Sequence, residues 1–423
     1  MRITRRDFGV VAGAAAGTLA APAILRAQST ARLVVIGGGP GGATVAKYVA
    51  KDSGGAIDVT LINDAPQFTT CFYSNLYLGG MRSFESITHS YDTLAEAYGI
   101  NMVIDRAVAV DPSAKTVALQ GGNTIEYDAL CVAPGIDMNY GAIEGYDEAA
   151  AEIMPHAWKA GAQTQILKQQ IEAMPEGGLF IMVAPPNPYR CPPGPYERAC
   201  LVAHYFKQHN PSAKILILDP KDKHSKQGLF QEAFSKYYPG MIEWVPGGFG
   251  GTITAVDPGS MMLISSDGDE HTADVANVIP AQVAGLIARD AGLTDDSGWC
   301  PIEAATMAST MADSVYVVGD ACIPGDMPKS GFSANSQAKV AAMAIRHALT
   351  DAPVFPPRFR NTCWSTLAEE DAVKVGANYE ATDEGIKTID GFISETGEDE
   401  TTRLQTKNEA DGWYDGIVSD VFS

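Results

Sequence analysis

The chain has 423 residues, which is long enough for two or three domains with sizeable apolar cores. Its 51 acidic and 30 basic residues give a formal net charge of −21, and this balance argues against a nucleic-acid partner, because duplex phosphates require a basic footprint. A hydrophobic fraction of 46% excludes global disorder, and seven cysteines are too few for a scaffold built on disulfides.

Residues 1–27 are predicted to be an export signal. Arg5 and Arg6 precede an apolar run rich in Gly and Ala, and a small-residue cleavage site follows at Ala27. The sequence around the two arginines resembles the twin-arginine motif, whose route exports folded proteins. We therefore expect a periplasmic protein that is not inserted in the membrane after signal cleavage near Ala27. An uncleaved N-terminal anchor is the alternative.

A dinucleotide-binding turn is predicted soon after the signal. Residues 31–36 form an apolar, β-branched run typical of a buried parallel strand, and they lead into a glycine-rich turn at 37–42 and a helical pattern. Strand, G-x-G-x-x-G and helix in this order predict pyrophosphate binding at the helix N-terminus. Gly37 allows the tight turn, Gly39 lets the backbone approach the ligand, and Gly42 allows close packing of helix and strand.

The end of the next expected strand, residues 58–62, predicts the ribose contact. An acidic residue that binds the ribose hydroxyls is typical of this position. Here Asn63 stands in that place, and Asp64 follows it. We expect these two residues to contact the adenosine ribose.

Two later strands complete the pattern. One is expected over 127–132, and another over 314–318 ends in Gly319 and Asp320. With these segments the chain resembles the flavoproteins that contain two dinucleotide-binding domains. In that family the acid of the Gly-Asp pair binds the ribityl chain of FAD, so the resemblance implies FAD as the cofactor.

An Ala-rich helix is expected over 332–349, directly after Lys329, Ser330 and Gly331. We assign these three residues to cofactor binding. A helix N-terminus aimed at the flavin would stabilise negative charge on the reduced ring.

The middle of the chain has two more expected strands, 178–184 and 213–218, but the turn after the first lacks a nucleotide motif. Residues 185–197 contain six prolines and one glycine. Proline has no backbone N–H group, so this turn cannot cradle a pyrophosphate, and NAD(P) binding is not expected. The stiff loop should instead hold Cys191 and Glu197 in fixed positions.

The proline-rich loop closely resembles the equivalent loop in the flavoprotein subunit of flavocytochrome c sulfide dehydrogenase, and more loosely that of sulfide:quinone oxidoreductases. Residues 69–75, Thr-Thr-Cys-Phe-Tyr-Ser-Asn, are similar to the segment that carries a cysteine thioether to FAD in the dehydrogenase. Residues 361–365, Asn-Thr-Cys-Trp-Ser, match its second redox cysteine, and the similarity continues to the C-terminal Phe422.

This resemblance implies a function for three cysteines, which we expect to lie in loops. Cys71 would link FAD covalently, while Cys191 and Cys363 would form a redox-active disulfide. A static cross-link between the latter two is the alternative. The remaining cysteines are expected to be structural: Cys131, Cys200, Cys300 and Cys322.

The implied reaction is oxidation of sulfide by a periplasmic sulfide dehydrogenase. Hydrosulfide would attack the Cys191–Cys363 disulfide, giving a persulfide and a thiolate, before electrons reach FAD. Glu197 is a candidate proton acceptor, or else a simple helix cap. No C-x-x-C-H motif supplies a haem, and no metal site is predicted, so the electron acceptor would be the c-type cytochrome subunit of that family.

Two other functions need the same cysteines and flavin. The chain could be an accessory redox module that reactivates a sulfur-oxidising complex, or a sulfide:quinone oxidoreductase. The acidic, polar residues 384–423 argue against the membrane docking that a quinone reductase requires.

The expected fold is α/β, with two Rossmann-like domains of the pyridine-nucleotide-disulfide-oxidoreductase type and a small C-terminal α+β domain. After the export signal, the expected domains are a split FAD-binding domain, a central domain without a nucleotide loop, and a C-terminal domain for flavin and partner binding. Their ranges are 31–155 with 275–354, then 156–274, then 355–423.

Overall fold

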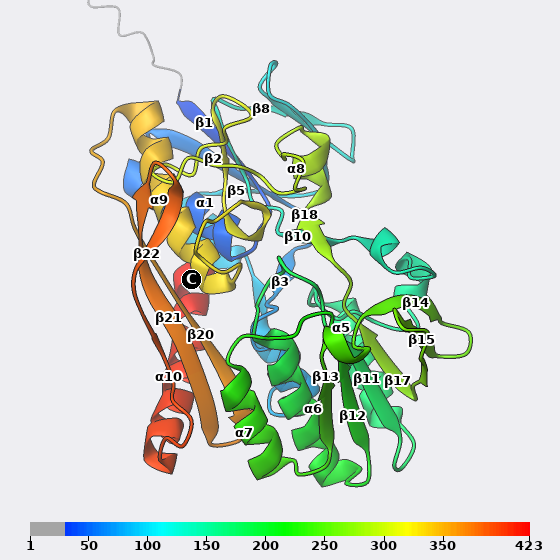
Figure 1. The fold of residues 1–423 in the computed structure, drawn as a ribbon. Helices are drawn as coiled ribbons and strands as arrows, with labels where there is room; N and C mark the ends of the chain where they lie inside the picture. Colours follow the sequence, from blue (N-terminus) through cyan, green and yellow to red (C-terminus); the bar gives the residue numbers. More distant parts are fainter. Residues whose placement is uncertain (1–29) are drawn as a thin grey trace, which may run out of the picture. The chain divides into compact units, whose positions relative to one another are not determined.

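The first sheet is built around the strand that precedes the glycine-rich turn (Figure 1). In the computed structural model, which describes residues 30–423, five parallel strands lie in the order β19-β9-β1-β2-β5. Their bounds are β1 Ala31–Ile36, β2 Ile57–Asn63, β5 Asn101–Ile104, β9 Ala129–Val132 and β19 Val315–Val317. The sheet thus joins the N-terminal segment to a strand far along the chain, as a split dinucleotide domain requires. The predicted export signal and its cleavage site lie outside the described residues.

Two helices pack beside each other on this sheet, α1 (Pro40–Ser53) and α9 (Gly331–Thr350). Pro40 at the first helical position and a left-handed Gly54 after the last turn set the bounds of α1. The side chain of Ser330 caps α9 by accepting a hydrogen bond from the backbone N–H of Ser333 at 3.1 Å. The helix predicted over 332–349 is therefore confirmed to within one residue at each end.

Small elements surround the first sheet. An antiparallel sheet contains β6 Ala107–Asp111, β7 Thr116–Leu119 and β8 Thr124–Glu126, and two strand pairs are β3 Gln67–Thr69 with β4 Thr88–Ser90 and β10 Ile136–Met138 with β18 Gln282–Ala284. The short helices are α2 Ser74–Leu78, α3 Asp92–Tyr98, α4 Glu148–Ala151 and α8 Leu286–Asp290.

A second parallel sheet lies in the middle of the chain, in the order β13-β12-β11-β17. Its strands are β11 Leu179–Val183, β12 Lys214–Leu218, β13 Ile242–Val245 and β17 Val275–Val278, and its helices are α5 Ala162–Ala173, α6 Gly194–His209 and α7 Gln227–Tyr237. An antiparallel sheet comprises β14 Ile253–Asp257, β15 Met262–Ser265 and β16 Glu270–Thr272. The expected pair of α/β sheets is therefore present.

The C-terminal part is an antiparallel sheet of long strands with a helix against it (Figure 1, orange and red). Its elements are β20 Arg358–Ala368, β21 Asp371–Thr382, β22 Gly385–Ile393 and α10 Glu400–Phe422. This agrees with the expected small α+β region. The prediction that Cys363 lies in a loop is wrong, because the residue is in the middle of β20, paired with Val375 of β21.

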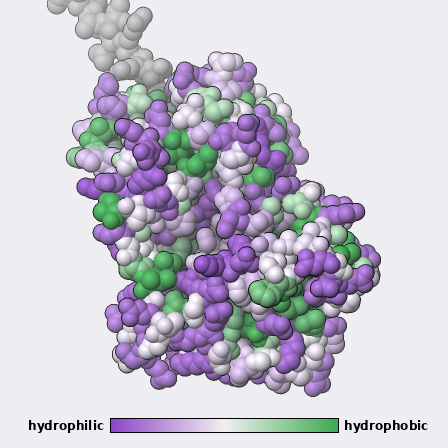
Figure 2. Space-filling view, viewed as in Figure 1, coloured by the Kyte–Doolittle hydropathy of each residue, from purple (hydrophilic) through white to green (hydrophobic). Residues whose placement is uncertain are grey.

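The surface is mixed in character. On the face shown in Figure 2, hydrophobic residues form small separate patches among hydrophilic ones. Within residues 30–423, no helix combines the length and the apolar character needed to span a membrane.

Candidate active site

The glycine-rich turn between β1 and α1 accepts no larger residue at two positions. Gly37 has φ +99°, and a Cβ atom there would lie 2.3 Å from the carbonyl oxygen of Ala133. A Cβ atom on Gly42 would lie 1.9 Å from the carbonyl oxygen of Gly37. Gly39 precedes the first residue of α1, so the backbone reaches the helix N-terminus without a side chain in the way. This close approach of backbone segments fits a pyrophosphate site.

Asn63 supports the turn from the end of β2. Its Oδ1 accepts a hydrogen bond from the backbone N–H of Gly38 at 2.9 Å, and its Nδ2 donates to the carbonyl oxygen of Ala65 at 2.8 Å. The amide thereby fixes the turn, and the neighbouring Asp64 places its carboxylate on the wall of the adjacent cavity.

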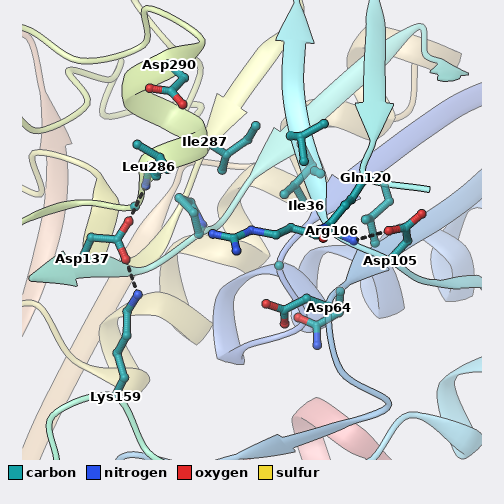
Figure 3. Close-up of a pocket in the computed structure, with 17 residues that line it drawn as sticks. Ile36, Asp64, Asp105, Arg106, Gln120, Asp137, Lys159, Leu286, Ile287 and Asp290 are labelled. Atoms are coloured by element: carbon teal, nitrogen blue, oxygen red, sulfur yellow. Dashed lines mark hydrogen bonds and ion pairs between the residues drawn. The ribbon is translucent and has the colours of Figure 1, made fainter. Parts of the chain in front are cut away.

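A cavity of about 420 Å³ opens beside Asn63 and Asp64 (Figure 3). The Arg106 side chain reaches into it, and Asp137 on another wall forms an ion pair with Lys159. The volume and the polar wall fit the adenosine half of a dinucleotide. Sequence reasoning missed Arg106, because a single arginine between two short strands belongs to no motif.

Asp320 lies on a 3₁₀ turn, Gly319–Ala321, directly after β19. It is buried, and one of its oxygens forms an ion pair with Arg190 at 3.5 Å. Its other oxygen, Oδ1, has no hydrogen-bond partner among the described residues. A buried carboxylate oxygen without a donor fits a ligand hydroxyl group, as the ribityl assignment of Asp320 requires.

The N-terminus of α9 contributes Ser330 and Gly331 to the wall of a second cavity. The Ser330 hydroxyl group donates to Oδ1 of Asn361 at 2.6 Å. Lys329 does not line this cavity, since its ammonium group donates to the carbonyl oxygens of Asp320 and Cys322, both at 2.7 Å. The Lys329 side chain therefore holds the Asp320 turn rather than facing the cavity.

Cys71, Cys191 and Cys363 all line this second cavity, which has a volume of about 80 Å³. They come from three separate segments: the turn before α2, the proline-rich loop and strand β20. All three are free thiols in the structure. The fold thus assembles the three cysteines that the sequence singled out.

The proline-rich loop is tied to the start of α9. The backbone N–H of Cys191 donates to the carbonyl oxygen of Lys329 at 2.8 Å, and Cys191 itself has φ +57°. The backbone N–H of Gly194 donates a hydrogen bond to the carbonyl oxygen of Cys191 at 2.8 Å. These bonds fix the Cys191 side chain against the cavity, as expected for a stiff loop.

Burial raises the pKa of the Cys191 and Cys363 thiols, but the polar groups around the two differ. For Cys191, the neighbouring Cys363 and Glu197 raise the pKa of the thiol further. For Cys363, Asn361 and Lys226 act against burial and lower the pKa of the thiol, and Nδ2 of Asn361 lies 3.3 Å from its sulfur. The surroundings of Cys363 are therefore more favourable to a thiolate.

Glu197 lies in the first turn of α6 and lines the same cavity. Its Oε2 accepts from Nδ2 of Asn75 at 2.8 Å, and its Oε1 accepts from the backbone N–H of Thr366 at 2.8 Å. Burial raises the pKa of the carboxyl group, while these two donors oppose the rise. Both oxygens bond to other segments, so these bonds do not serve as a cap for α6.

Arg198, the next residue of α6, is 1% exposed and also lines the cavity. Its guanidinium donates to neutral oxygens only: Oδ1 of Asn75, Oδ1 of Asn277, and two backbone carbonyl groups. Burial lowers the pKa of Arg198 to about 9. No sequence pattern marked this buried cation, because two adjacent charged residues usually lie on a solvated face.

The acidic residue at the end of the second strand of the central sheet is bonded within the protein. Asp219 follows β12, where an adenosine-binding acid would stand, but it is 0% exposed. It accepts hydrogen bonds from the Tyr196 hydroxyl at 2.5 Å and from Nε1 of Trp244 at 3.0 Å, and it pairs with Lys221 at 2.7 Å. These bonds engage both carboxylate oxygens of Asp219 with groups of the protein itself.

Comparison with known proteins identifies the class of fold first. Residues 31–171 match the family profile of the pyridine nucleotide-disulphide oxidoreductases. The solved sulfide:quinone oxidoreductase of Aquifex aeolicus superposes with a TM-score of 0.70 at 21% identity, covering 92% of each chain. A NAD-dependent persulfide reductase from A. fulgidus gives a TM-score of 0.62 at 15% identity, covering 90% of this chain and 77% of that one. The chain has the fold of a two-domain flavin-dependent oxidoreductase.

Two more specific profiles define the family. Residues 164–280 match the central part of the sulfide dehydrogenase [flavocytochrome c] flavoprotein chain, and residues 355–422 match the flavin-binding region of flavocytochrome c sulphide dehydrogenase. The flavoprotein chain of Chlorobaculum thiosulfatiphilum is 50% identical over 46 residues, 11% of this chain and 94% of that sequence. The sulfide-quinone reductase of Aquifex aeolicus (strain VF5) is 25% identical over 366 residues, 80% of this chain and 81% of that one.

The chain is a flavoprotein related to the flavocytochrome c sulfide dehydrogenase flavoprotein chain and to the sulfide:quinone oxidoreductases. It is a sulfide-oxidising flavoprotein, and its flavin is FAD. The glycine turn, the free oxygen of Asp320 and the adenosine-sized cavity fit that cofactor.

Proposed function

We propose that the protein oxidises sulfide at a redox-active disulfide between Cys191 and Cys363. The supporting observation is the second cavity, where the two cysteines lie with Cys71 and the buried Glu197. Cys363 raises the pKa of the Cys191 thiol, which requires the two residues to be close together. A cavity of about 80 Å³ admits a hydrosulfide ion but not a large thiol.

In the first step, hydrosulfide attacks one sulfur of the disulfide. A new S–S bond forms to the substrate, the Cys191–Cys363 bond breaks, and one cysteine leaves as a thiolate. When the substrate arrives as H₂S, Glu197 accepts its proton, because Asn75 and Thr366 hold the carboxylate on the cavity wall. When bound, FAD would supply an acceptor for the two electrons of the oxidation, which it could pass on one at a time.

Cys71 is the proposed covalent attachment point for the flavin. It lines the cavity, and burial raises the pKa of its thiol while the nearby Arg190 opposes that rise. Arg190 also pairs with Asp320, the proposed ribityl ligand, so Cys71 lies on the flavin side of the cofactor site. A thioether here would keep FAD bound during export.

The proposed electron acceptor is a c-type cytochrome subunit, and the proposed location is the periplasm. The family profiles that match the central and C-terminal regions are those of a flavocytochrome c flavoprotein, which supports the cytochrome. A quinone acceptor is the second candidate, because the Aquifex relative is named a sulfide-quinone reductase. The twin-arginine-like sequence at Arg5 and Arg6 supports export.

The acceptor is tested with the purified protein under anaerobic conditions, with sulfide as the donor. We expect sulfide to bleach the flavin, and oxidised c-type cytochrome to restore its colour faster than a short-chain quinone in detergent. Faster reoxidation by the quinone would replace the cytochrome proposal. No bleaching by sulfide would favour the accessory-module alternative.

A further inference from the structure

Lys226 is a buried lysine at the back of the sulfur site. It precedes the first residue of α7, has φ +57° and is 6% exposed. Its ammonium group donates to the carbonyl oxygen of Cys363 at 3.0 Å and to the Ser365 hydroxyl at 2.8 Å. A charged ammonium group in an apolar interior is costly, so its position next to a redox cysteine requires an explanation.

No carboxylate balances this charge directly. Among the described residues, Lys226 forms no ion pair, and its two hydrogen-bond acceptors, the Cys363 carbonyl and the Ser365 hydroxyl, are both neutral. Two other buried cations have such partners, since Arg403 pairs with Asp371 at 3.2 Å and Lys168 pairs with Glu172 at 3.3 Å. Lys226 instead resembles Arg198, which also bonds to neutral oxygens at this cavity. Glu197 is close enough to raise the pKa of Lys226 but forms no ion pair with it, so the ammonium group could still pair directly with an anion at the cavity.

Sulfide oxidation would create that charge. Opening of the disulfide by hydrosulfide leaves one persulfide and one thiolate, so the closed cavity gains a negative charge whichever sulfur is attacked. Arg198 on α6 is the other buried cation at the cavity. Its guanidinium group already donates hydrogen bonds to Asn75, to Asn277 and to backbone carbonyl oxygens. Lys226, in contrast, bonds to the backbone of the cysteine itself.

We propose that Lys226 is a positioning residue that stabilises anionic sulfur on Cys363. Its role in turnover rests on the proposed disulfide mechanism, but its effect on the Cys363 thiol does not require sulfide. The Lys226 ammonium and the Asn361 amide favour the thiolate form of Cys363, and Ser330 assists them. Glu197 on α6, Cys191 on the loop and Tyr379 on β21 are the titratable groups that face the same thiol.

The lysine must itself be protonated for this effect. Burial lowers the pKa of Lys226 to about 8, while Cys363, Glu197 and Cys191 act in the opposite direction. The ammonium form is thus retained at neutral pH, and a thiolate on Cys363 would strengthen it further. The stabilisation should weaken as the pH rises above about 8.

The test measures alkylation of the reduced, flavin-containing protein by iodoacetamide as a function of pH. Peptide mass spectrometry separates Cys363 from Cys191. In the wild-type protein, we expect Cys363 to react at lower pH than Cys191. In Lys226→Met the midpoint for Cys363 should rise by about one pH unit, which is about tenfold less thiolate below the midpoint.

Three further variants distinguish charge from packing. Lys226→Arg should restore most of the wild-type profile, because it retains the charge. Lys226→Gln keeps a hydrogen-bond donor without the charge, so it should behave as Lys226→Met and serves alone if the methionine variant does not fold. Lys168→Met is the control, a buried lysine of α5 whose removal should leave the Cys363 midpoint unchanged.

An unchanged Cys363 midpoint in a folded Lys226→Gln protein would overturn the proposal. So would an equal shift in Lys168→Met, because the effect would then be a general loss of stability. A shift in the Lys226 variants without any sulfide-driven bleaching in the wild type would refute the proposed function but not the role of the lysine. Bleaching by sulfide with no shift would refute the lysine role alone.

Discussion

The amide nitrogen of Asn75 donates to a carboxylate oxygen of Glu197 at 2.8 Å, which joins the segment of Cys71 to the proline-rich loop of Cys191. The carbonyl oxygen of the same amide accepts from Nε of Arg198 at 3.0 Å. Asn75 therefore bridges a buried cation and a buried carboxyl group, and it keeps their charges apart. Its position fixes the orientation of the proposed proton acceptor.

Replacement of Glu197 by Gln should slow sulfide-driven flavin reduction roughly 100-fold or more, a typical loss for a general base. In the wild-type protein, the rate of sulfide-driven flavin reduction should fall as the pH is lowered. The reason is that the carboxylate of Glu197 becomes protonated at a higher pH than an ordinary glutamate. The glutamine variant should lose the part of this acidic limb that Glu197 causes and follow only the ionisation of the sulfide itself. Stopped-flow bleaching between pH 5 and 8 measures both, and a wild-type pH profile in Glu197→Gln would contradict the assignment.

The same variant should change the pH dependence of stability. Burial raises the pKa of Glu197 in the folded protein, so its stabilising contribution is present at low pH and is lost as the pH rises through that pKa. Glutamine cannot ionise, so the stability of the variant relative to the wild type should increase with pH. Urea unfolding at pH 5 and pH 8 tests this sign.

Replacement of Asn75 by Ala should cost about 1–3 kcal/mol of stability, because a buried carboxylate oxygen and the Nε of Arg198 both lose a partner. It should also move the acidic limb of flavin reduction to higher pH, since Asn75 lowers the pKa of Glu197. If the variant is less stable but the acidic limb of its flavin-reduction pH profile stays at the wild-type pH, Asn75 has only a packing role.

NADH and NADPH should not bleach the flavin at a useful rate. Asp219 is bonded internally to Tyr196 and Trp244, and the proline-rich loop offers no cradle for a pyrophosphate. Anaerobic addition of stoichiometric NADH tests this, with dithionite as the control for a reducible flavin. Rapid bleaching by NADH would refute this part of the account.

Acid denaturation followed by filtration should leave the flavin with the wild-type polypeptide and release it from Cys71→Ser. The expected reason is the proposed thioether at Cys71, which lines the cavity beside Arg190. A yellow filtrate from the wild type would disprove the covalent link. The assignment of FAD as the cofactor would still stand.

Local patterns in the sequence predicted the parts of the fold that depend on neighbouring residues. The β1 strand, the glycine turn and the capped start of α9 each follow from short motifs, and the structure confirms them. The same is true of buried Cys131 and Cys200, which lie in an apolar strand and on a helix. These features require no knowledge of distant segments.

The charged part of the site could not be predicted in this way. Arg198 and Lys226 are buried only because segments far apart in the chain close over them, and no local pattern marks that closure. Cys363 was misplaced in a loop because Asn-Thr-Cys-Trp-Ser is polar, whereas in β20 most of this stretch is buried on both sides of the sheet. Lys329 was assigned to the cofactor from its place before a helix, but its side chain binds two carbonyl groups.

The central claim is that a disulfide between Cys191 and Cys363 carries the reaction. Stopped-flow bleaching by sulfide, normalised to bound FAD, tests it in Cys191→Ser and Cys363→Ser, with Cys200→Ala as a control for a buried cysteine of α6. Serine cannot form the bond, so both serine variants should retain FAD and lose sulfide-driven bleaching, whereas the control should keep it. A purely structural cross-link would instead cost about 2–4 kcal/mol of stability and leave the rate per flavin unchanged. Wild-type rates in both serine variants would contradict the account.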